Sequence, residues 1–600
     1  MAQDKLEQIT KKIIERSKKT REIYLERIQT YKGKIYRKNL GCANLAHAYA
    51  SIPKHIKERI KKNEGLNYAI ISAYNDMLSA HQPFKNYPDI IKKEVFKHNA
   101  FAQFAGGTPA MCDGITQGYE GMELSLFSRD VVAMSVAIAL SHNVFDGAFY
   151  LGICDKIVPG LLIGALSYGY LPSIFIPSGP MTSGISNDEK SKARQLFAEG
   201  KISRDKLLES EMKSYHDIGT CTFYGTANSN QMMMEFMGLH LPNSAFINPN
   251  TTLREALVKK AASHMATYKI KGIGELLSEK NIINAIIGLM ATGGSTNHTI
   301  HLVAIARAAG IIINWDDFDT ISNITPLLAK VYPNGKADVN QFEASGGIAF
   351  IIHELLKEGL LHDDVDTVMG KGMQIYTQNP FLIDNKIIYK QGVTISKNKN
   401  ILRNIENPFS KNGGVKILRG NIGRAVIKIS SVKEEHQIIK APALVFHSQQ
   451  EFLQSFQNKE LQKDFIAVIP YQGPKANGMP ELHKLTPPLE VLQDQGFKVA
   501  LITDGRMSGA SGKVPAAIHM SPEALLEGNI AKIKNGDLLL LDAKNGILEV
   551  LIDKKEWQKR KINKFKNKEV FGYGRELFAG FRAQSSSAET GAMNFGGYFS

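Results

Sequence analysis

Cysteine and tryptophan are scarce in this chain, which has four cysteines and two tryptophans among its 600 residues. Four cysteines form too few disulfide bonds to stabilise a protein of this size, so a secreted disulfide scaffold is excluded. A reducing compartment, the cytoplasm, is predicted. Residues 1–37 carry charges from Asp4 onward and contain no apolar run, which is unlike a signal peptide.

Long uninterrupted apolar stretches are also missing. The longest segment without a charged residue, 157–187, is broken by several prolines and glycines. A membrane-spanning helix needs about 20 mostly apolar residues in one unbroken run. The segment is therefore predicted to form a buried helix followed by a buried strand, and no membrane partner is expected.

The formal net charge of +15 would suit a nucleic-acid binder if it covered a binding surface. The excess lies instead in residues 1–65 and 554–569, and the rest of the chain is close to neutral. Neither basic segment resembles a nucleic-acid module or interleaves its cations with aromatic residues. The two basic segments are therefore predicted to lie on the surface, and no nucleic-acid partner is expected. The alternative is a nucleic-acid-binding protein that uses these two segments, which a salt-dependent gel shift would reveal.

The chain is too long for one hydrophobic core and is expected to form roughly two to four domains. Residues 1–66 are predicted as a helical segment, since Leu6, Ile9 and Ile13 recur at helical spacing. Apolar strands alternate with helices through residues 67–385, a pattern typical of a parallel sheet covered on both faces. The predicted fold class of this part is α/β.

Residues 386–600 form a different pattern of short apolar runs separated by turns. Many short strands with turns between them predict a barrel-like C-terminal domain. The segment 385–424, which is rich in Lys, Asn and Gly, is predicted as an exposed connection between the two parts.

Three of the four cysteines lie in glycine-containing turns: Cys112 in AMCDGITQG, Cys154 in GICDKIVPG and Cys221 in GTCTFYG. A single cysteine is most often a small buried hydrophobic residue, and that alternative stands for each of them. Zinc sites usually contain closely spaced cysteine pairs, which these widely separated positions do not form. Single cysteines from separate loops suit an iron–sulfur cluster, which is the hypothesis for this set.

Two aspartates directly follow these cysteines, Asp113 after Cys112 and Asp155 after Cys154. An isolated aspartate in a turn usually caps or forms the turn. Two Cys–Asp pairs at matching predicted strand ends indicate instead a hard-cation site beside a thiolate site. Carboxylate oxygens are ligands that suit Mg²⁺.

Several further motifs follow in a fixed order. They are GICDKIVPG (152–160), GTCTFYGTANSN (219–230), GGSTNH (293–298), GPKANGMPE (473–481) and TDGRMSGASG (503–512). Together they resemble the dihydroxy-acid and phosphogluconate dehydratase family, over about residues 41–580. The resemblance implies an N-terminal α/β domain that holds the metals and a swivelling C-terminal β-barrel domain that closes over them.

The resemblance also implies the reaction, the dehydration of a 2,3-dihydroxy carboxylate by a hydro-lyase. The motifs NDMLSAHQPF (75–84), SHNVFDG (141–147) and GPKANGMPELHK (473–484) resemble the branch that converts 6-phosphogluconate to 2-dehydro-3-deoxy-6-phosphogluconate and water in the Entner–Doudoroff pathway. A dihydroxy-acid or unphosphorylated sugar-acid dehydratase of the same family is the alternative. Relatives further imply a homodimer.

Matched motif by motif, the resemblance implies iron–sulfur ligands at Cys154 and Cys221. The third cysteine of the family, expected near residues 75–84, is absent there. Cys112 is preferred to Cys42 as the third ligand because it adjoins a metal-site aspartate. The cluster is expected to be 4Fe–4S, with 2Fe–2S as the alternative.

The same matching implies Asp113, Asp155 and Glu481 as ligands of Mg²⁺ or a similar divalent ion. Lys156 corresponds to a lysine that is carbamylated in part of the family and would then add an oxygen ligand; an ion pair with Asp155 is the alternative. Ser508 corresponds to the base that removes the C2 proton, and without the resemblance it would be interpreted as a turn hydroxyl.

Three cationic candidates lie close to these positions: His483 and Lys484 follow Glu481, and Lys513 follows Ser508 by five residues. Arg, Lys and His donors hold a terminal phosphate well. The three residues are therefore predicted to bind the phosphate of the substrate. Plain surface lysines are the alternative for Lys484 and Lys513.

Overall fold

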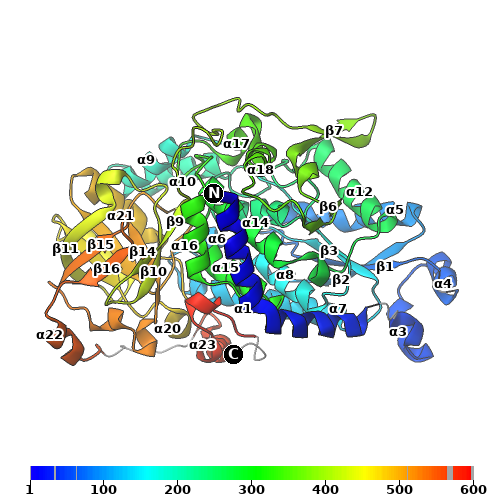
Figure 1. The fold of residues 1–600 in the computed structure, drawn as a ribbon, viewed down its shortest axis with the longest axis horizontal. Helices are drawn as coiled ribbons and strands as arrows, with labels where there is room; N and C mark the ends of the chain where they lie inside the picture. The colour runs from blue at the N-terminus through cyan, green and yellow to red at the C-terminus, as the bar shows by residue number, and fades with distance from the viewer. Residues whose placement is uncertain (1, 33–35, 63, 510, 564–571, 596–600) are drawn as a thin grey trace.

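The N-terminal segment is helical in the computed structural model, which describes residues 2–32, 36–62, 64–509, 511–563 and 572–595. Helix α1 (Ala2–Tyr31) runs along the body of the molecule and buries Ile13, Tyr24 and Ile28 against it (Figure 1). Three short helices follow, α2 (Tyr36–Asn39), α3 (Cys42–Tyr49) and α4 (Lys54–Lys61). The helices predicted for this segment are confirmed.

A four-stranded parallel sheet forms the centre of the α/β part. Its strands lie in the order β2 (Phe101–Gly107), β1 (Asn67–Ser72), β3 (Gly147–Leu151) and β4 (Ser173–Ile176). The last three are buried along their whole length, which explains their continuous apolar sequence. The predicted parallel sheet is confirmed. Strand β2 was missed because it lies at the sheet edge and consists mainly of Ala, Gly and Gln beside two Phe.

Helices α5 (Tyr87–Lys97), α7 (Ser125–Leu140) and α8 (Ile157–Ser167) connect these strands. Helix α8 packs closely on α7, since a Cβ at Gly160 would lie 2.4 Å from the carbonyl oxygen of Arg129. The charge-free segment 157–187 contains α8 and β4, so the buried helix and strand predicted there are confirmed. Among the described residues, no helix is both long and apolar enough to cross a membrane.

A block of helices lies between the sheet and the barrel (Figure 1). Helix α15 packs on α8 of the sheet part, and α16 packs on strand β9 of the barrel. The block and its surroundings contain α11 (Thr226–Phe236), α12 (Thr252–Thr267), α14 (Glu279–Thr292), α15 (His298–Ala308), α16 (Trp315–Ile324), α17 (Val339–Ser345) and α18 (Gly347–Lys357). Helices α9 (Asn187–Ala198) and α10 (Arg204–Ser214) lie on the barrel side of the sheet part.

The C-terminal part forms a closed eight-stranded barrel, so the predicted barrel is confirmed. Strands β11 to β14 are parallel neighbours, and β11, β15 and β16 pair antiparallel. Around the barrel the order is β10 (Arg424–Lys428), β14 (Ala516–Ser521), β13 (Val499–Thr503), β12 (Phe465–Ile469), β11 (Ile438–Val445), β15 (Leu538–Asp542), β16 (Ile547–Val550) and β9 (Val415–Arg419).

The prediction for 385–424 is partly wrong. This segment contains β8 (Lys386–Gln391), which pairs with β7 (Gln378–Ile383), and the barrel strand β9. The Lys- and Asn-rich composition reflects the turns and the exposed hairpin, and it obscured the short apolar run of β9. The division of the chain into 1–66, 67–385 and 386–600 stays a prediction.

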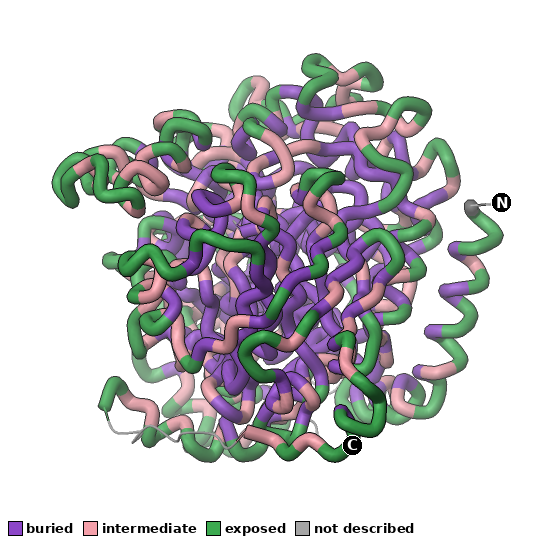
Figure 2. Tube along the Cα trace, turned by 90° about the vertical axis from the view of Figure 1, so that its left-hand side faces the viewer, coloured by how far each residue is buried: buried purple, intermediate pink, exposed green. Residues whose placement is uncertain are grey.

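Strand β12 is buried on both faces. In β12, Ile466 and Val468 belong to the core inside the barrel, whereas Phe465, Ala467 and Ile469 belong to the large core shared with the helices. Buried residues accordingly fill the interior and exposed residues follow the rim (Figure 2). The barrel and the α/β part therefore pack tightly enough to share a site between them.

Candidate active site between the sheet and the barrel

Loops at the carboxyl ends of the parallel strands carry the predicted site residues. Strand β2 leads to Cys112 and Asp113, and β3 leads to Cys154, Asp155 and Lys156, which immediately precedes α8. Both strands flank β1, so their carboxyl ends open on the same edge of the sheet. This placement explains why residues far apart in the sequence converge.

The parallel strands of the barrel supply the opposite side of the site. Strand β12 leads toward Glu481 and β13 leads toward Arg506, and these two residues form an isolated parallel bridge. One carboxylate oxygen each from Asp113, Asp155 and Glu481 lie within 4.8 Å of one another. Within the described part of the chain this is the one such group of potential metal ligands. The predicted set of three oxygen ligands is thus brought together.

Two buried cations lie against these carboxylates. Arg506 Nη1 is 2.7 Å from Glu481 Oε1, and Arg506 Nη2 is 3.4 Å from Asp113 Oδ2. Lys156 donates a short hydrogen bond to Asp113, and its Nζ lies 3.5 Å from Asp155 Oδ2. Three carboxylates thus face two cations, which leaves one negative charge in excess. The ion-pair alternative for Lys156 matches this geometry, and its carbamylation stays a prediction.

Burial shifts the acid–base behaviour of the three carboxyl groups in different directions. Burial raises the pKa of Glu481 to about 7 despite the neighbouring Arg506, and it also raises the pKa of Asp155. Burial opposes ionisation of Asp113 too, but Lys156 and Arg506 together hold its pKa below the usual value. Ionising three buried carboxylates together costs free energy, because burial and mutual repulsion both disfavour the charged form. A divalent cation bound between them would offset this cost. The donor set therefore fits a magnesium ion.

Neutral side chains fix the orientation of the carboxylates. Gln117 Nε2 donates to Glu481 Oε2 at 2.9 Å, and Asn297 Nδ2 donates to Glu481 Oε1 at 3.1 Å. Ser125 Oγ donates to Asp113 Oδ1 at 2.6 Å. Asn297 belongs to the GGSTNH motif, so part of that motif serves to hold a carboxylate. Such partners outside the ligand set orient metal ligands.

The three predicted cluster cysteines meet beside the carboxylates. Cys221 reaches the site because Thr220 pairs with Pro180, just beyond β4. Burial raises the pKa of Cys154 and of Cys221, the latter to about 12, and the neighbouring Cys112 raises the pKa of both further. Thiols held protonated by burial become thiolates when they bind a metal. Cys42, by contrast, lies exposed at the start of α3.

The cysteines do not form a group whose ligand atoms all lie within 4.8 Å, as one metal ion would require. A cluster of several irons is larger than one ion and takes thiolates that are farther apart. Asn228 and Asn230 shape the loops: their amides donate to the carbonyl oxygens of Cys221 at 2.7 Å and Cys154 at 3.2 Å. Cys154 itself has a left-handed backbone with φ of 75°. Cys112 lies close enough to Cys154 and Cys221 to raise the pKa of both, and thiolates are the ligands of iron–sulfur clusters, so this donor set fits such a cluster.

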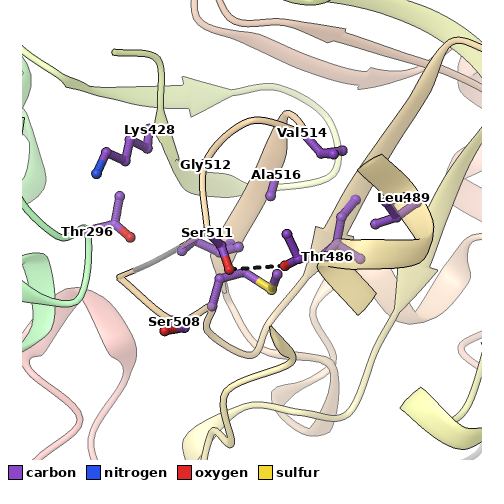
Figure 3. Close-up of a pocket in the computed structure, with 12 residues that line it drawn as sticks. Thr296, Lys428, Thr486, Leu489, Ser508, Ser511, Gly512, Val514 and Ala516 are labelled. Atoms are coloured by element: carbon purple, nitrogen blue, oxygen red, sulfur yellow. Dashed lines mark hydrogen bonds between the residues drawn. The ribbon is translucent and has the colours of Figure 1, made fainter. Parts of the chain in front are cut away.

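Ser508 lies in the loop after β13 and lines a cavity of about 30 Å³ (Figure 3). The loop approaches the start of α11 closely, since a Cβ at Gly509 would lie 2.6 Å from the backbone nitrogen of Thr226. Ser511, in the same loop, contacts His483 Nδ1 at 2.8 Å and Thr486 Oγ1 at 3.1 Å. The glycine-rich sequence is thus needed for close packing, and it presents Ser508 to the cavity.

The predicted phosphate ligands lie elsewhere around the site. Lys484 Nζ donates to the carbonyl oxygen of Gly118 at 3.3 Å, and Lys513 Nζ lies 3.9 Å from Glu490 Oε2. Burial lowers the pKa of His483 to about 3, so its ring is neutral at neutral pH. None of the three is among the described residues that line the Ser508 cavity. Their role in phosphate binding stays a prediction.

Comparison with known proteins agrees with this geometry. The sequence profile of the dihydroxy-acid/6-phosphogluconate dehydratase N-terminal domain matches residues 67–378, and that of the C-terminal domain matches residues 400–592. The chain belongs to this family. The two matches cover the sheet part and the barrel, with the site between them.

Individual relatives extend the similarity over nearly the full length. The chain is 63% identical to phosphogluconate dehydratase of Helicobacter pylori, over 99% of this chain and 100% of the relative. It is 53% identical to the enzyme of the same name from Escherichia coli, over 97% of this chain and 98% of the relative. A dihydroxy-acid dehydratase of Acetivibrio thermocellus is 35% identical over 82% of this chain and 87% of the relative. The family that the motifs resembled is therefore confirmed.

Several site residues were missed in the sequence. Arg506 lies inside the quoted TDGRMSGASG motif, but nothing in the motif indicated that it pairs with Glu481 and Asp113. Lys428, which lines the Ser508 cavity, ends the apolar run RAVIK of strand β10. A lysine in a strand buried on both faces is the one signal that could have marked it.

Proposed function

We propose that this protein dehydrates 6-phosphogluconate to 2-dehydro-3-deoxy-6-phosphogluconate. The observation that carries the proposal is the convergence of a carboxylate triad, three cysteines and Ser508 between sheet and barrel, in a chain of this dehydratase family. The high identity to relatives named phosphogluconate dehydratase favours this substrate over a branched dihydroxy acid.

The proposal assigns two cofactor sites. Asp113, Asp155 and Glu481 would hold Mg²⁺ or a similar divalent ion, and Cys112, Cys154 and Cys221 would hold an iron–sulfur cluster, for which we favour the 4Fe–4S type. When bound, these groups would supply Lewis-acid stabilisation of the substrate carboxylate and of the departing C3 hydroxyl. Gln117 and Asn297 keep Glu481 oriented for this task.

Ser508 is proposed to act as the base. Its Oγ takes the proton from C2 while the hydroxyl group leaves C3, so that one proton and one hydroxide depart as water. The enol that remains takes up a proton at C3, loses the proton of its C2 hydroxyl group and becomes the 2-keto acid. A serine with an ordinary pKa cannot remove this proton, so the positive charges of the site must favour its alkoxide.

One assay tests the function directly. Protein purified without oxygen is analysed for iron and sulfide and then given 6-phosphogluconate or 2,3-dihydroxyisovalerate, with release of the keto acid as the readout. Efficient turnover of 6-phosphogluconate is expected. A strong preference for dihydroxyisovalerate would instead assign the dihydroxy-acid activity of the family.

Finer features of the protein are part of the same proposal. We propose that Lys484, Lys513 and His483 contribute to recognition of the substrate phosphate, that the protein is a homodimer and that it works in the cytoplasm. Four free cysteines are compatible with a reducing compartment. Light scattering of the purified protein measures the oligomeric state.

A further inference from the structure

Lys428 differs from the other cations near the site because it is buried without a partner. The residue is 7% exposed, and no atom of the described residues accepts a hydrogen bond from its Nζ. Lys156 and Arg506, in contrast, are both paired with carboxylates. A buried ammonium group is costly unless a partner compensates it. The position of Lys428 therefore requires an explanation.

The register of strand β10 decides which way Lys428 faces. Ala425 and Ile427 belong to the core inside the barrel, whereas Val426 belongs to the core on its outer side. Because side chains alternate along a strand, Lys428 lies on the same outer face as Val426. A Cβ at Gly512 would lie 3.4 Å from Lys428 Cδ, so the lysine stem packs against the Ser508 loop.

Lys428 lines the cavity that Ser508 lines, with its amino group on the side of Thr296. Figure 3 shows Lys428, the hydroxyl group of Thr296 and Ser508 around one space, each from a different segment of the chain. Lys428 is the one charged residue among the described residues that line it, and most of the others are apolar. The nearby ring of His298 is neutral, because burial lowers its pKa to about 3. The cavity thus offers a single cation to a ligand.

The cavity also adjoins the carboxylate site. Thr296 lines it, and the next residue, Asn297, donates to Glu481 at 3.1 Å. At about 30 Å³ the cavity has room for one end of a substrate whose reacting carbons lie at Ser508, next to the carboxylate triad. Burial lowers the pKa of Lys428 to about 7, and an anion bound beside it would restore the charged form.

We propose that Lys428 is a substrate-binding residue whose amino group donates to an anionic oxygen of the substrate in the Ser508 cavity. This inference rests on the proposed function and adds a residue to it. The substrate has two sources of such an oxygen, the carboxylate end next to the reacting carbon and the terminal phosphate. Both are recognised by the same chemistry, a charge-assisted hydrogen bond from an ammonium group.

The test compares Lys428→Met with Lys440→Met. Methionine keeps the apolar stem of lysine and removes its charge, so the first variant should fold. Lys440 is an exposed lysine of barrel strand β11 and serves as the matched control. The Michaelis constant for 6-phosphogluconate should rise about 10- to 150-fold in Lys428→Met and stay unchanged in the control.

A second measurement does not depend on turnover. The thermal stabilisation of wild type and variants is recorded with 6-phosphogluconate, gluconate and inorganic phosphate. Loss of stabilisation by 6-phosphogluconate and gluconate in Lys428→Met supports the proposal and assigns the carboxylate end. Loss with 6-phosphogluconate and inorganic phosphate supports it and assigns the phosphate.

Equal stabilisation of wild type and Lys428→Met by all three ligands would overturn the proposal, as would an unchanged Michaelis constant. These outcomes are distinguishable from failure of the proposed function itself. In that case wild-type protein with its full iron content would not release keto acid from 6-phosphogluconate, whatever residue stands at position 428.

Discussion

The two ends of the active site differ in how their buried charges are compensated. At the carboxylate end, Asp113, Asp155 and Glu481 are compensated by Lys156 and Arg506 within the protein. At the Ser508 end, the one cation that lines the cavity has no partner among the described residues. The first end has internal ion pairs, whereas we propose that a ligand supplies the missing partner at the second. The substrate can therefore be aligned by the end that lacks a partner and activated by the end that is already organised.

The largest expected effect is the loss of the iron–sulfur cluster beside the carboxylate end when its cysteine ligands are replaced. Cys154→Ser and Cys221→Ser should each abolish the visible cluster absorbance and the activity, because a hydroxyl group is a poor ligand for an iron–sulfur cluster. Cys112→Ser should impair both. Absorption spectra, iron content and keto-acid release check this.

Cys42→Ser is the matched control, since Cys42 is exposed at the start of α3. It should leave the spectrum and the activity unchanged. If Cys42→Ser loses the cluster while Cys112→Ser retains it, the third ligand has been assigned to the wrong cysteine.

Ser508→Ala separates chemistry from binding at the second end. Turnover should fall by about 10²–10⁴-fold, the usual contribution of a positioned base, while the cluster absorbance and the affinity for 6-phosphogluconate persist. Exchange of the C2 hydrogen with solvent deuterium should be lost together with dehydration. Exchange that continues in Ser508→Ala would show that a different group takes the proton.

Arg506→Met tests how far internal pairing stabilises the carboxylate end. Removing this cation leaves Glu481 and Asp113 buried with less compensation, so the free energy of unfolding should fall by about 3–5 kcal/mol. Added Mg²⁺ should recover part of the loss, because it replaces positive charge at the same carboxylates. Urea unfolding with and without Mg²⁺ measures both effects.

Arg419→Met provides the comparison for this experiment. Arg419 pairs with Asp316 at 2.6 Å but is 44% exposed, and such surface pairs contribute about 0–1 kcal/mol. A loss in Arg506→Met as small as that of the surface variant would mean that the buried pairs do not stabilise the site.

The sequence predicted the elements whose pattern is local. The apolar runs of β1, β3 and β4 indicated the parallel sheet, and the Cys–Asp pairs at strand ends indicated the convergence of Asp113 and Asp155. Both predictions agree with the structure because the burial of a strand, and the position of a residue at its end, can be inferred from neighbouring residues alone.

The missed features depend on contacts between distant segments. Strand β9 is recognisable only as the strand that closes the barrel between β10 and β16. The pairing of Arg506 with Asp113 requires the barrel to lie against the sheet. In the sequence, Lys428 is one lysine in an apolar run. Its role depends on which face of β10 borders the cavity. Each of these needs tertiary structure to be seen.

The last prediction concerns the free-energy cost of burying the unpartnered Lys428. Burial lowers the pKa of Lys428 from its ordinary value of 10.5 to about 7, with neutral His298 as its titratable neighbour. Between these values the unfolded chain binds the proton and the folded chain does not, so this group makes stability rise with pH. Below about pH 7 both states are protonated and the full penalty is present. Lys428→Met should therefore be more stable than wild type by on the order of a few kcal/mol at pH 6, and the difference should shrink toward pH 10. Thermal unfolding of both proteins across this range measures it, and a difference that does not depend on pH would show that the lysine is compensated in the free protein.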